Sequence, residues 1–166
     1  MKQLKRFILI LGTIIILSCN SDDNKSNSQG FLFDGSVNIF LKNSQGENLI
    51  NTATFNSNNY KIYYEINGQK TEVNNPLMDA PKGFYINQES NPISMRLYLN
   101  VPPNENTTST TTYIEWNNSD TDTLKTHFVK GDGYLVWAKL WLNDEVVWEE
   151  GSSTSNLGRE ITIIKD

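Results

Sequence analysis

The sequence predicts an all-β protein: a single antiparallel two-sheet sandwich of about eight strands, with an immunoglobulin-like or transthyretin-like topology. Three observations indicate this fold. Apolar and polar residues alternate with a period of two after residue 30, turn sequences separate the alternating segments, and helical spacing is absent over any useful length. Because parallel neighbours need long crossover connections, which are usually helical, we expect the strands to pair antiparallel.

The first three predicted strands alternate clearly and end at strong turn signals. Residues 37–42 place Val, Ile and Leu at alternate positions before a polar turn. Residues 60–66 do the same with Tyr and Ile, and they end at Asn67-Gly68, the strongest short hairpin signal. Residues 93–101 give the cleanest alternation, and the two prolines that follow stop the strand.

Five further segments complete the eight strands: residues 114–116, 124–128, 134–142, 146–148 and 161–164. Turns rich in Asn, Asp and Gly separate most of them. Residues 74–92 and 102–111, with their Pro, Asn and Thr, are expected to be long loops. Residues 30–166, about 137 residues, are enough for one domain with one hydrophobic core.

The first 18 residues have the features of an export signal. Lys2, Lys5 and Arg6 give a positive amino-terminal region, and an apolar run follows from Phe7 to Leu17. That run of about 11 residues is shorter than the roughly 20 needed to cross a membrane. Residues 1–18 are therefore predicted to be a signal peptide that is removed.

The signal ends at Ile16-Leu17-Ser18-Cys19, which resembles the bacterial lipobox. The resemblance implies a diacylglycerol on the sulfur of Cys19 and an acyl chain such as palmitate on the new amino terminus, so that the membrane is a partner. Cys19 is the only cysteine, so the protein has no internal disulfide and its sandwich is expected to be stabilised by packing alone. In this interpretation Cys19 is an anchor and not a nucleophile.

Residues 19–29 are predicted to be the lipidated cysteine and a flexible tether, because positions 20–29 contain no apolar side chain. Ser21, Asp22 and Asp23 resemble the acidic signal that sends lipoproteins of Bacteroidota to the outer face of the outer membrane. The alternative is a solvated linker that is acidic by chance. We expect anchoring in the outer membrane with display at the cell surface.

The folded part is similar to small uncharacterised lipoproteins of Bacteroidota, through residues 37–50, 60–68 and 116–124. This resemblance implies a location and a fold but no activity. The net charge is −5, and removal of three basic residues with the signal gives about −5 − 3 = −8. Nucleic acid is therefore not an expected partner.

Sequence motifs for catalysis or metal binding are weak. The only histidine, His127, is interpreted as a surface residue, and no Gly-x-Ser-x-Gly elbow accompanies it. We therefore expect no metal site, no cofactor and no enzymatic activity. Asp122-Thr123-Leu124 resembles the short O-glycosylation sequon of Bacteroidota, which implies a possible glycan on Thr123.

Alternation in residues 134–142 predicts a candidate binding face. If Leu140 and Leu142 point into the core, the intervening side chains point outward. The candidate face comprises Trp137, Lys139, Trp141, Tyr98 and Tyr113. Outward aromatic side chains are typical of glycan-binding and protein-binding surfaces. The alternative is that the loop at 74–92 lies over the tryptophans.

The sequence thus favours a non-enzymatic lipoprotein, cell-surface or periplasm-facing, that binds a glycan or an envelope protein through one sheet face. The alternative is a structural or accessory subunit of an outer-membrane complex with no soluble ligand. A hydrolase is a remote third possibility.

Overall fold

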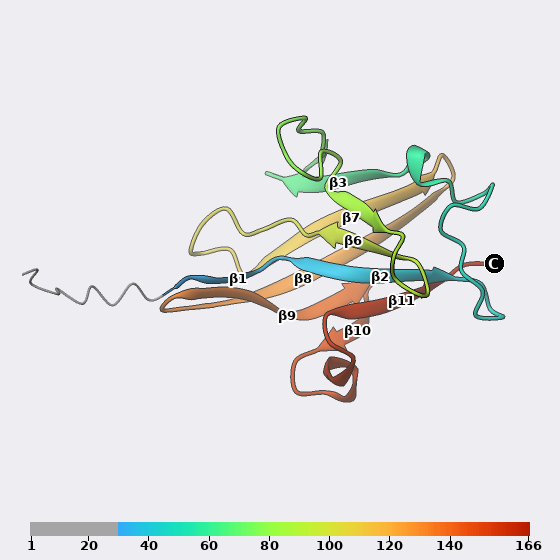
Figure 1. The fold of residues 1–166 in the computed structure, drawn as a ribbon. Helices are drawn as coiled ribbons and strands as arrows, with labels where there is room; N and C mark the ends of the chain where they lie inside the picture. Colours follow the sequence, from blue (N-terminus) through green and yellow to red (C-terminus); the bar gives the residue numbers. More distant parts are fainter. Residues whose placement is uncertain (1–29) are drawn as a thin grey trace, which may run out of the picture.

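The computed structural model describes residues 30–166, apart from the side chains of residues 156 and 157. Within this range the chain forms two sheets packed face to face, so the predicted all-β sandwich is confirmed (Figure 1). Cys19, Ser21, Asp22 and Asp23 lie outside the described residues, and the predictions made for them remain predictions.

The described strands number eleven and not about eight. The first six are β1 (Leu32–Asp34), β2 (Ser36–Lys42), β3 (Lys61–Ile66), β4 (Gln69–Glu72), β5 (Phe84–Asn87) and β6 (Ser94–Tyr98). The others are β7 (Ser109–Asn117), β8 (Asp120–Gly131), β9 (Tyr134–Leu142), β10 (Glu145–Glu149) and β11 (Glu160–Ile164). Short 3-10 helices, η1 (Ser57–Asn59) and η2 (Ser153–Leu157), precede β3 and β11.

All eight predicted strands are present, and the sequence pattern missed β1, β4 and β5. These three have only three or four residues each, which is too short for alternation to be recognised. The predicted loop at 74–92 therefore contains a strand, and the end of the loop predicted at 102–111 belongs to β7.

Sheet A has seven strands in the order β1-β9-β8-β7-β3-β4, with β10 also paired to β9. Sheet B has four strands in the order β11-β2-β6-β5. The prediction of purely antiparallel pairing is wrong at two places, because β1 runs parallel to β9 and β11 runs parallel to β2. In both pairs most of the domain separates the partners in sequence, so a dedicated crossover helix is not needed.

One hydrophobic core lies between the sheets. Sheet A contributes Ile62, Ile114, Trp116, Leu124, Phe128, Trp137 and Leu140, and sheet B contributes Val37, Ile39, Leu41, Met95, Leu97, Ile161 and Ile163. All of these side chains are buried. They alternate with outward residues along each strand, which is the period that the sequence showed.

The alternation breaks once in β9, and this break decides which tryptophan is exposed. His127 of β8 pairs with Lys139, but the next residue, Phe128, pairs with Trp137. Ala138 is thus an extra residue, a β-bulge, and it reverses the faces of the residues before it. Trp137 and Leu140 consequently both point into the core.

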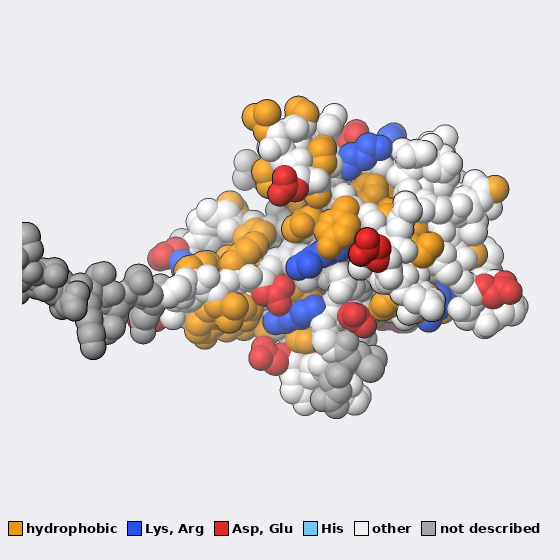
Figure 2. Space-filling model, viewed as in Figure 1, with side chains coloured by type: hydrophobic (Ala, Val, Ile, Leu, Met, Phe, Trp, Pro, Cys, Tyr) orange, Lys and Arg blue, Asp and Glu red, His pale blue; other side chains and the backbone are white. Residues whose placement is uncertain are grey.

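Several large apolar side chains stay exposed. Figure 2 shows hydrophobic side chains at the tip of the loop above β3 and again towards the N-terminal end of the described chain. Leu77, in the loop between β4 and β5, is 93% exposed, and Phe31, Leu32 and Met78 are each more than half exposed. Isolated apolar surface residues are ordinary, but adjacent ones such as Leu77 and Met78 form a candidate contact surface.

Candidate binding surface

Three aromatic side chains share the outer face of sheet A. Residues next to them in sequence are fully buried, namely Ile62, Ile114 and Leu140. Tyr63, Tyr113 and Trp141 therefore point away from the core, because successive strand residues face opposite sides. Each of the three is partly exposed. They come from β3, β7 and β9 and form a row across the sheet.

The register gives the spacing of this row. Tyr63 lies directly opposite Tyr113, and Trp141 lies opposite Lys125 of β8, which in turn pairs with Thr111 of β7. Trp141 is thus two strands and two residues away from Tyr113, or roughly 12 Å for standard strand geometry.

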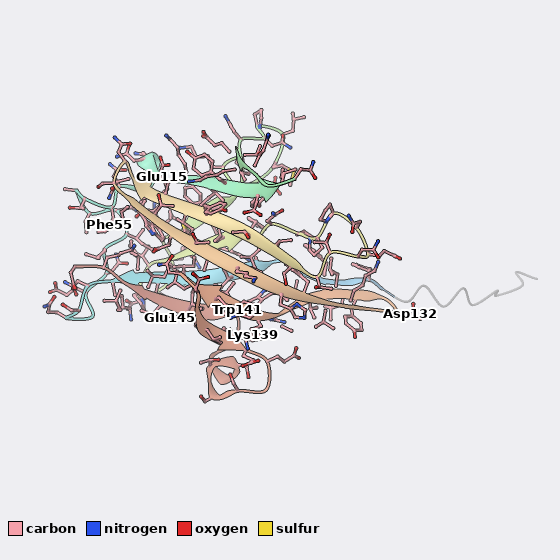
Figure 3. The ribbon with its side chains drawn as sticks, turned by 180° about the vertical axis from the view of Figure 1, so that it is seen from behind. Phe55, Glu115, Asp132, Lys139, Trp141 and Glu145 are labelled. Atoms are coloured by element: carbon pink, nitrogen blue, oxygen red, sulfur yellow. The ribbon has the colours of Figure 1, made fainter. Side chains whose placement is uncertain are left out.

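Lysine side chains lie over the rings. Lys70 Nζ is 4.3 Å from the centre of the Tyr63 ring and 5.1 Å from that of Tyr113. Lys125 and Lys139 place their Nζ atoms 5.7 and 5.2 Å from the Trp141 ring. Figure 3, seen from behind, shows Lys139 and Trp141 close together where β9 meets β10. Cation–π contacts at exposed sites are weak, about 0.5–1 kcal/mol, so a ligand can displace these lysines.

Carboxylates bind both tyrosine hydroxyls. Tyr113 Oη donates to Glu65 Oε2 at 2.7 Å, and Tyr63 Oη donates to Glu115 Oε2 at 3.2 Å. The hydrogen bond to Glu65, followed by burial, raises the pKa of Tyr113. Burial and then the charge of Glu115 raise the pKa of Tyr63. Both phenols therefore stay neutral at physiological pH and can act as donors.

Trp137 does not belong to this surface, and its assignment to the candidate face is wrong. Its side chain is 0% exposed, and its Nε1 donates to the carbonyl of Ser36 at 3.0 Å. The Trp148 ring lies 4.4 Å away, and the guanidinium of Arg159 lies 4.2 Å from the Trp137 ring centre. Arg159 also pairs with Asp34 at 2.7 Å. Trp137 is a core residue because of the bulge at Ala138.

Tyr98 also lies elsewhere. It is in β6 of sheet B, while Tyr113, Lys139 and Trp141 are in sheet A. The five predicted residues therefore do not form one face, since alternation along a strand cannot show which of two sheets the strand joins. Three of them, Tyr113, Lys139 and Trp141, are brought together.

The loop at 74–92 does not cover the tryptophans, contrary to the alternative considered from sequence. Its exposed residues Leu77 and Met78 instead line a groove with Tyr64 and Ile66, which are on the inner face of β3. In Figure 3 no ribbon of the described chain crosses in front of β7 and β8. The outer face of sheet A is therefore open to a ligand.

Lys70 and Lys125 also belong to this surface, although neither was predicted to. Lys70 lies in β4, which was not predicted as a strand, although the Asn67-Gly68 turn indicates a returning strand after β3. Lys125 is outward by simple alternation with the buried Leu124. Its pairing with Trp141 depends on the register between β8 and β9, which alternation does not provide.

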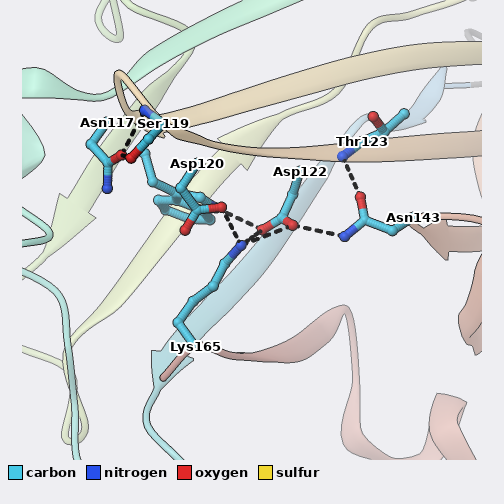
Figure 4. A network of polar contacts seen from close by, with 8 residues as sticks. Asn117, Ser119, Asp120, Asp122, Thr123, Asn143 and Lys165 are labelled. Atoms are coloured by element: carbon cyan, nitrogen blue, oxygen red, sulfur yellow. Dashed lines mark hydrogen bonds and ion pairs between the residues drawn. The ribbon is translucent and has the colours of Figure 1, made fainter.

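A buried ionic network joins the end of the chain to sheet A (Figure 4). Lys165 Nζ lies 2.6 Å from Asp120 Oδ1 and 2.9 Å from Asp122 Oδ2. Trp116 Nε1 donates to Asp122 at 2.6 Å, and Asn143 Nδ2 donates to it at 2.8 Å. Burial lowers the pKa of Lys165, but hydrogen bonds and charges from both aspartates outweigh this and raise it overall. We interpret the network as structural, because both carboxylate oxygens of Asp122 accept hydrogen bonds from within the protein.

Thr123 lies on the outer face, next to this ionic network. It pairs with Tyr113 across β7 and β8 and is partly exposed, and its backbone N–H donates to Asn143 Oδ1 at 2.8 Å. A glycan on Thr123 would therefore occupy the same surface as the aromatic row.

His127 is partly exposed on the same face, between Ser109 of β7 and Lys139 of β9, with its Nδ1 3.4 Å from Ser109 Oγ. Among residues 30–166, no three His, Cys, Asp or Glu side chains are grouped as metal ligands would be. Within the same residues, no helix has the length and apolar composition to cross a membrane.

Comparisons with protein-family models, curated proteins and solved structures give no match. What the surface can do must therefore be inferred from its own side chains. It offers flat aromatic rings, neutral and charged donors, and carboxylate acceptors.

Proposed function

We propose that the chain is a non-enzymatic lipoprotein of the outer membrane that binds a glycan through the outer face of sheet A. The observation that carries the binding proposal is the row of Tyr63, Tyr113 and Trp141 on an open sheet face. Sugar rings stack on aromatic rings through their apolar C–H faces, and their hydroxyls need nearby hydrogen-bonding groups.

The side chains around the row supply those groups. Glu65 and Glu115 accept hydrogen bonds from the tyrosines and have further lone pairs for sugar hydroxyls. Lys125 and Lys139 can swing away from Trp141 and donate to the same ligand. Because the tyrosine hydroxyls already bind both carboxylates, we propose that this surface binds a glycan without hydrolysing it.

A glycan array tests this proposal with matched variants. The wild-type chain is compared with the Tyr113→Ala, Trp141→Ala double variant and with Tyr98→Ala, which removes a similarly exposed aromatic ring from sheet B. We expect the double variant to lose the glycans that the wild type binds, and Tyr98→Ala to keep them. Equal profiles for all three proteins contradict binding through this face, and retention of an envelope protein without any glycan favours the protein-binding alternative.

The location is supported by the sequence of the amino-terminal segment, with its lipobox-like Ile16 to Cys19 and the acidic Ser21, Asp22 and Asp23. Metabolic labelling with a palmitate analogue, with Cys19→Ala as the control, tests the anchor. Protease treatment of intact cells tests surface display. Equal labelling of Cys19→Ala contradicts lipidation, and resistance to protease contradicts display.

A further inference from the structure

A second, chemically different surface lies at an open end of the sandwich. The groove has a volume of about 900 Å³ and lies between the inner face of sheet A and the end of β6. Tyr64, Ile66 and Val73 line one side, and Tyr98 and Val101 line the other. Tyr64 and Ile66 are on the inner face of β3 and Tyr63 is on its outer face, so the apolar part of the groove and the aromatic row lie on opposite faces of sheet A.

The groove exists because the two sheets do not end together. Ile62, Tyr64 and Ile66 are on the same inner face of β3, yet Ile62 is fully buried and Ile66 is 49% exposed. Sheet B cannot cover Ile66, because β6 ends at Tyr98 and the chain leaves the sheet there. Core-type side chains at this end of sheet A are consequently left partly uncovered in the described structure.

The loop between β4 and β5 holds two more apolar side chains above this groove. Asn75 organises the loop: its Oδ1 accepts from the N–H of Leu77 at 3.1 Å, its carbonyl accepts from Met78, and its N–H donates to Pro81 at 2.8 Å. Leu77 and Met78 are thereby presented outward, 93% and 61% exposed. An ordered loop that exposes Leu and Met is typical of a protein contact, where methionine adapts to the partner's shape.

The charges at the groove have one sign. Its charged lining residues are Asp79 in the loop and Glu72 at the edge strand β4, where Glu72 lies directly opposite Tyr63, and no lysine or arginine lines it. Both carboxylates are exposed, and in the part of the chain that the structure describes neither forms an ion pair. A basic group on the occupant would complement them, whereas anionic lipid head groups would be repelled.

We propose that this groove binds an extended segment of a partner protein that carries bulky apolar side chains next to lysine or arginine. A small apolar molecule in the groove would leave the tip of Leu77 in water. The occupant must therefore be large enough to fill the groove and also cover Leu77. A second copy of this chain does not fit the charges, because its loop tip carries the same Asp79 and the whole chain has a net charge of −5.

The test uses the full chain and a set of synthetic peptides. The first peptide has a Phe-Leu pair between lysines, the second replaces the lysines with glutamates, and the third replaces Phe-Leu with Ser-Ser. The two groove variants are Leu77→Ser with Met78→Ser, and Asp79→Lys. The controls are Val146→Ser, which removes a 48% exposed apolar residue on β10, and Asp132→Lys in an exposed turn.

We expect the wild type to bind only the lysine-flanked Phe-Leu peptide. Each groove variant should weaken this binding about ten-fold, and the effect of charge reversal should shrink as salt is added. The controls should bind like the wild type. All three groove positions are exposed, so the variants should keep the urea unfolding midpoint of the wild type.

Three results overturn the proposal. The first is that the wild type binds the glutamate-flanked peptide as strongly as the lysine-flanked one, or binds neither peptide. The second is equal binding by groove variants and controls. The third is a concentration-dependent dimer, or binding to vesicles of anionic lipid, that the Leu77→Ser, Met78→Ser variant abolishes, because either result assigns the groove to another occupant.

Discussion

Replacing Lys165 with methionine is expected to remove the ion pairs that join the end of the chain to sheet A. Lys165 and Asp122 have side chains that are 15% and 3% exposed, while Asp120 is 27% exposed. At an effective dielectric constant of about 20, each ion pair near 3 Å is worth roughly 5 kcal/mol before desolvation. Methionine fills a similar volume, so the change mainly leaves two carboxylates without their cation.

The net cost depends on the charge that stays buried. Removing one partner from a buried ion pair typically costs about 3–5 kcal/mol. Asp120 is partly solvated and repulsion between the two aspartates already offsets some of the attraction, so the lower end, about 3 kcal/mol, is expected. For a domain of this size that loss lowers the urea midpoint by about 2 M, with a slope near 1.5 kcal/mol per molar.

Equilibrium urea unfolding measures this loss, and two further variants identify its cause. Lys139→Met breaks a more exposed pair, in which Glu149 is 48% exposed, and should cost less than about 1 kcal/mol. Adding Asp122→Asn to Lys165→Met removes the uncompensated charge while keeping an acceptor for Trp116, so at least half of the stability should return. A Lys165→Met protein no less stable than Lys139→Met refutes the reasoning.

The stability that Lys165 contributes should change with pH in one direction. The folded-state pKa of Lys165 is raised, so its contribution is fully present below the unfolded-state pKa, about 10.4, and is lost as pH rises through the folded value. The stability difference between wild type and Lys165→Met should therefore be constant from neutral pH to about pH 10 and shrink above it. A difference that is already lost at pH 9 contradicts this assignment.

Three other predictions concern stability and titration. Trp137→Ala should lower the free energy of unfolding by about 3–5 kcal/mol and Trp141→Ala by less than about 1, and similar losses contradict the bulge-based assignment of their faces. Thr126→Val should stabilise the fold by about 1 kcal/mol, because Thr126 Oγ1 is buried and has no hydrogen-bond partner among residues 30–166; a loss in urea unfolding contradicts that picture. Burial raises the pKa of Tyr64 to about 12, so its stabilising effect is present below about pH 10 and lost towards pH 12. Tyr64→Phe should remove tyrosinate absorbance near pH 12, and loss of amplitude near pH 10 instead contradicts the shift.

Period-two alternation was sufficient to predict the sandwich and most of its strands. Ile39, Leu41, Leu97 and Ile114 lie in the core as the pattern indicates, because each strand has one face buried along its length. The chain also turns at Asn67-Gly68, where both residues have positive φ angles of 53° and 76°, as a two-residue hairpin requires.

The candidate surface was only partly predictable, because its members are fixed by pairing between strands. Nothing in residues 134–142 marks Ala138 as an extra residue, since a bulge is visible only against the neighbouring strand. Trp137 was therefore assigned to the wrong face and Trp141 to the correct one. Tyr98 faces outward as predicted but from the other sheet, which its own strand cannot reveal.

Long-range contacts were beyond the sequence pattern altogether. Lys165 binds Asp122, which is 43 positions away, and their contact requires that β11 join sheet B beside β2. The groove likewise results from the different lengths of two sheets. Alternation within single strands contains no information on either point.

The most direct test of binding through the outer face of sheet A is calorimetric titration with the glycan that scores highest on the array. Each stacked ring should contribute about 1–2 kcal/mol. The Tyr113→Ala, Trp141→Ala variant should therefore bind at least about thirty-fold more weakly than the wild type, while Tyr98→Ala binds equally well. Unchanged affinity in the double variant, or an equal loss in Tyr98→Ala, contradicts the account.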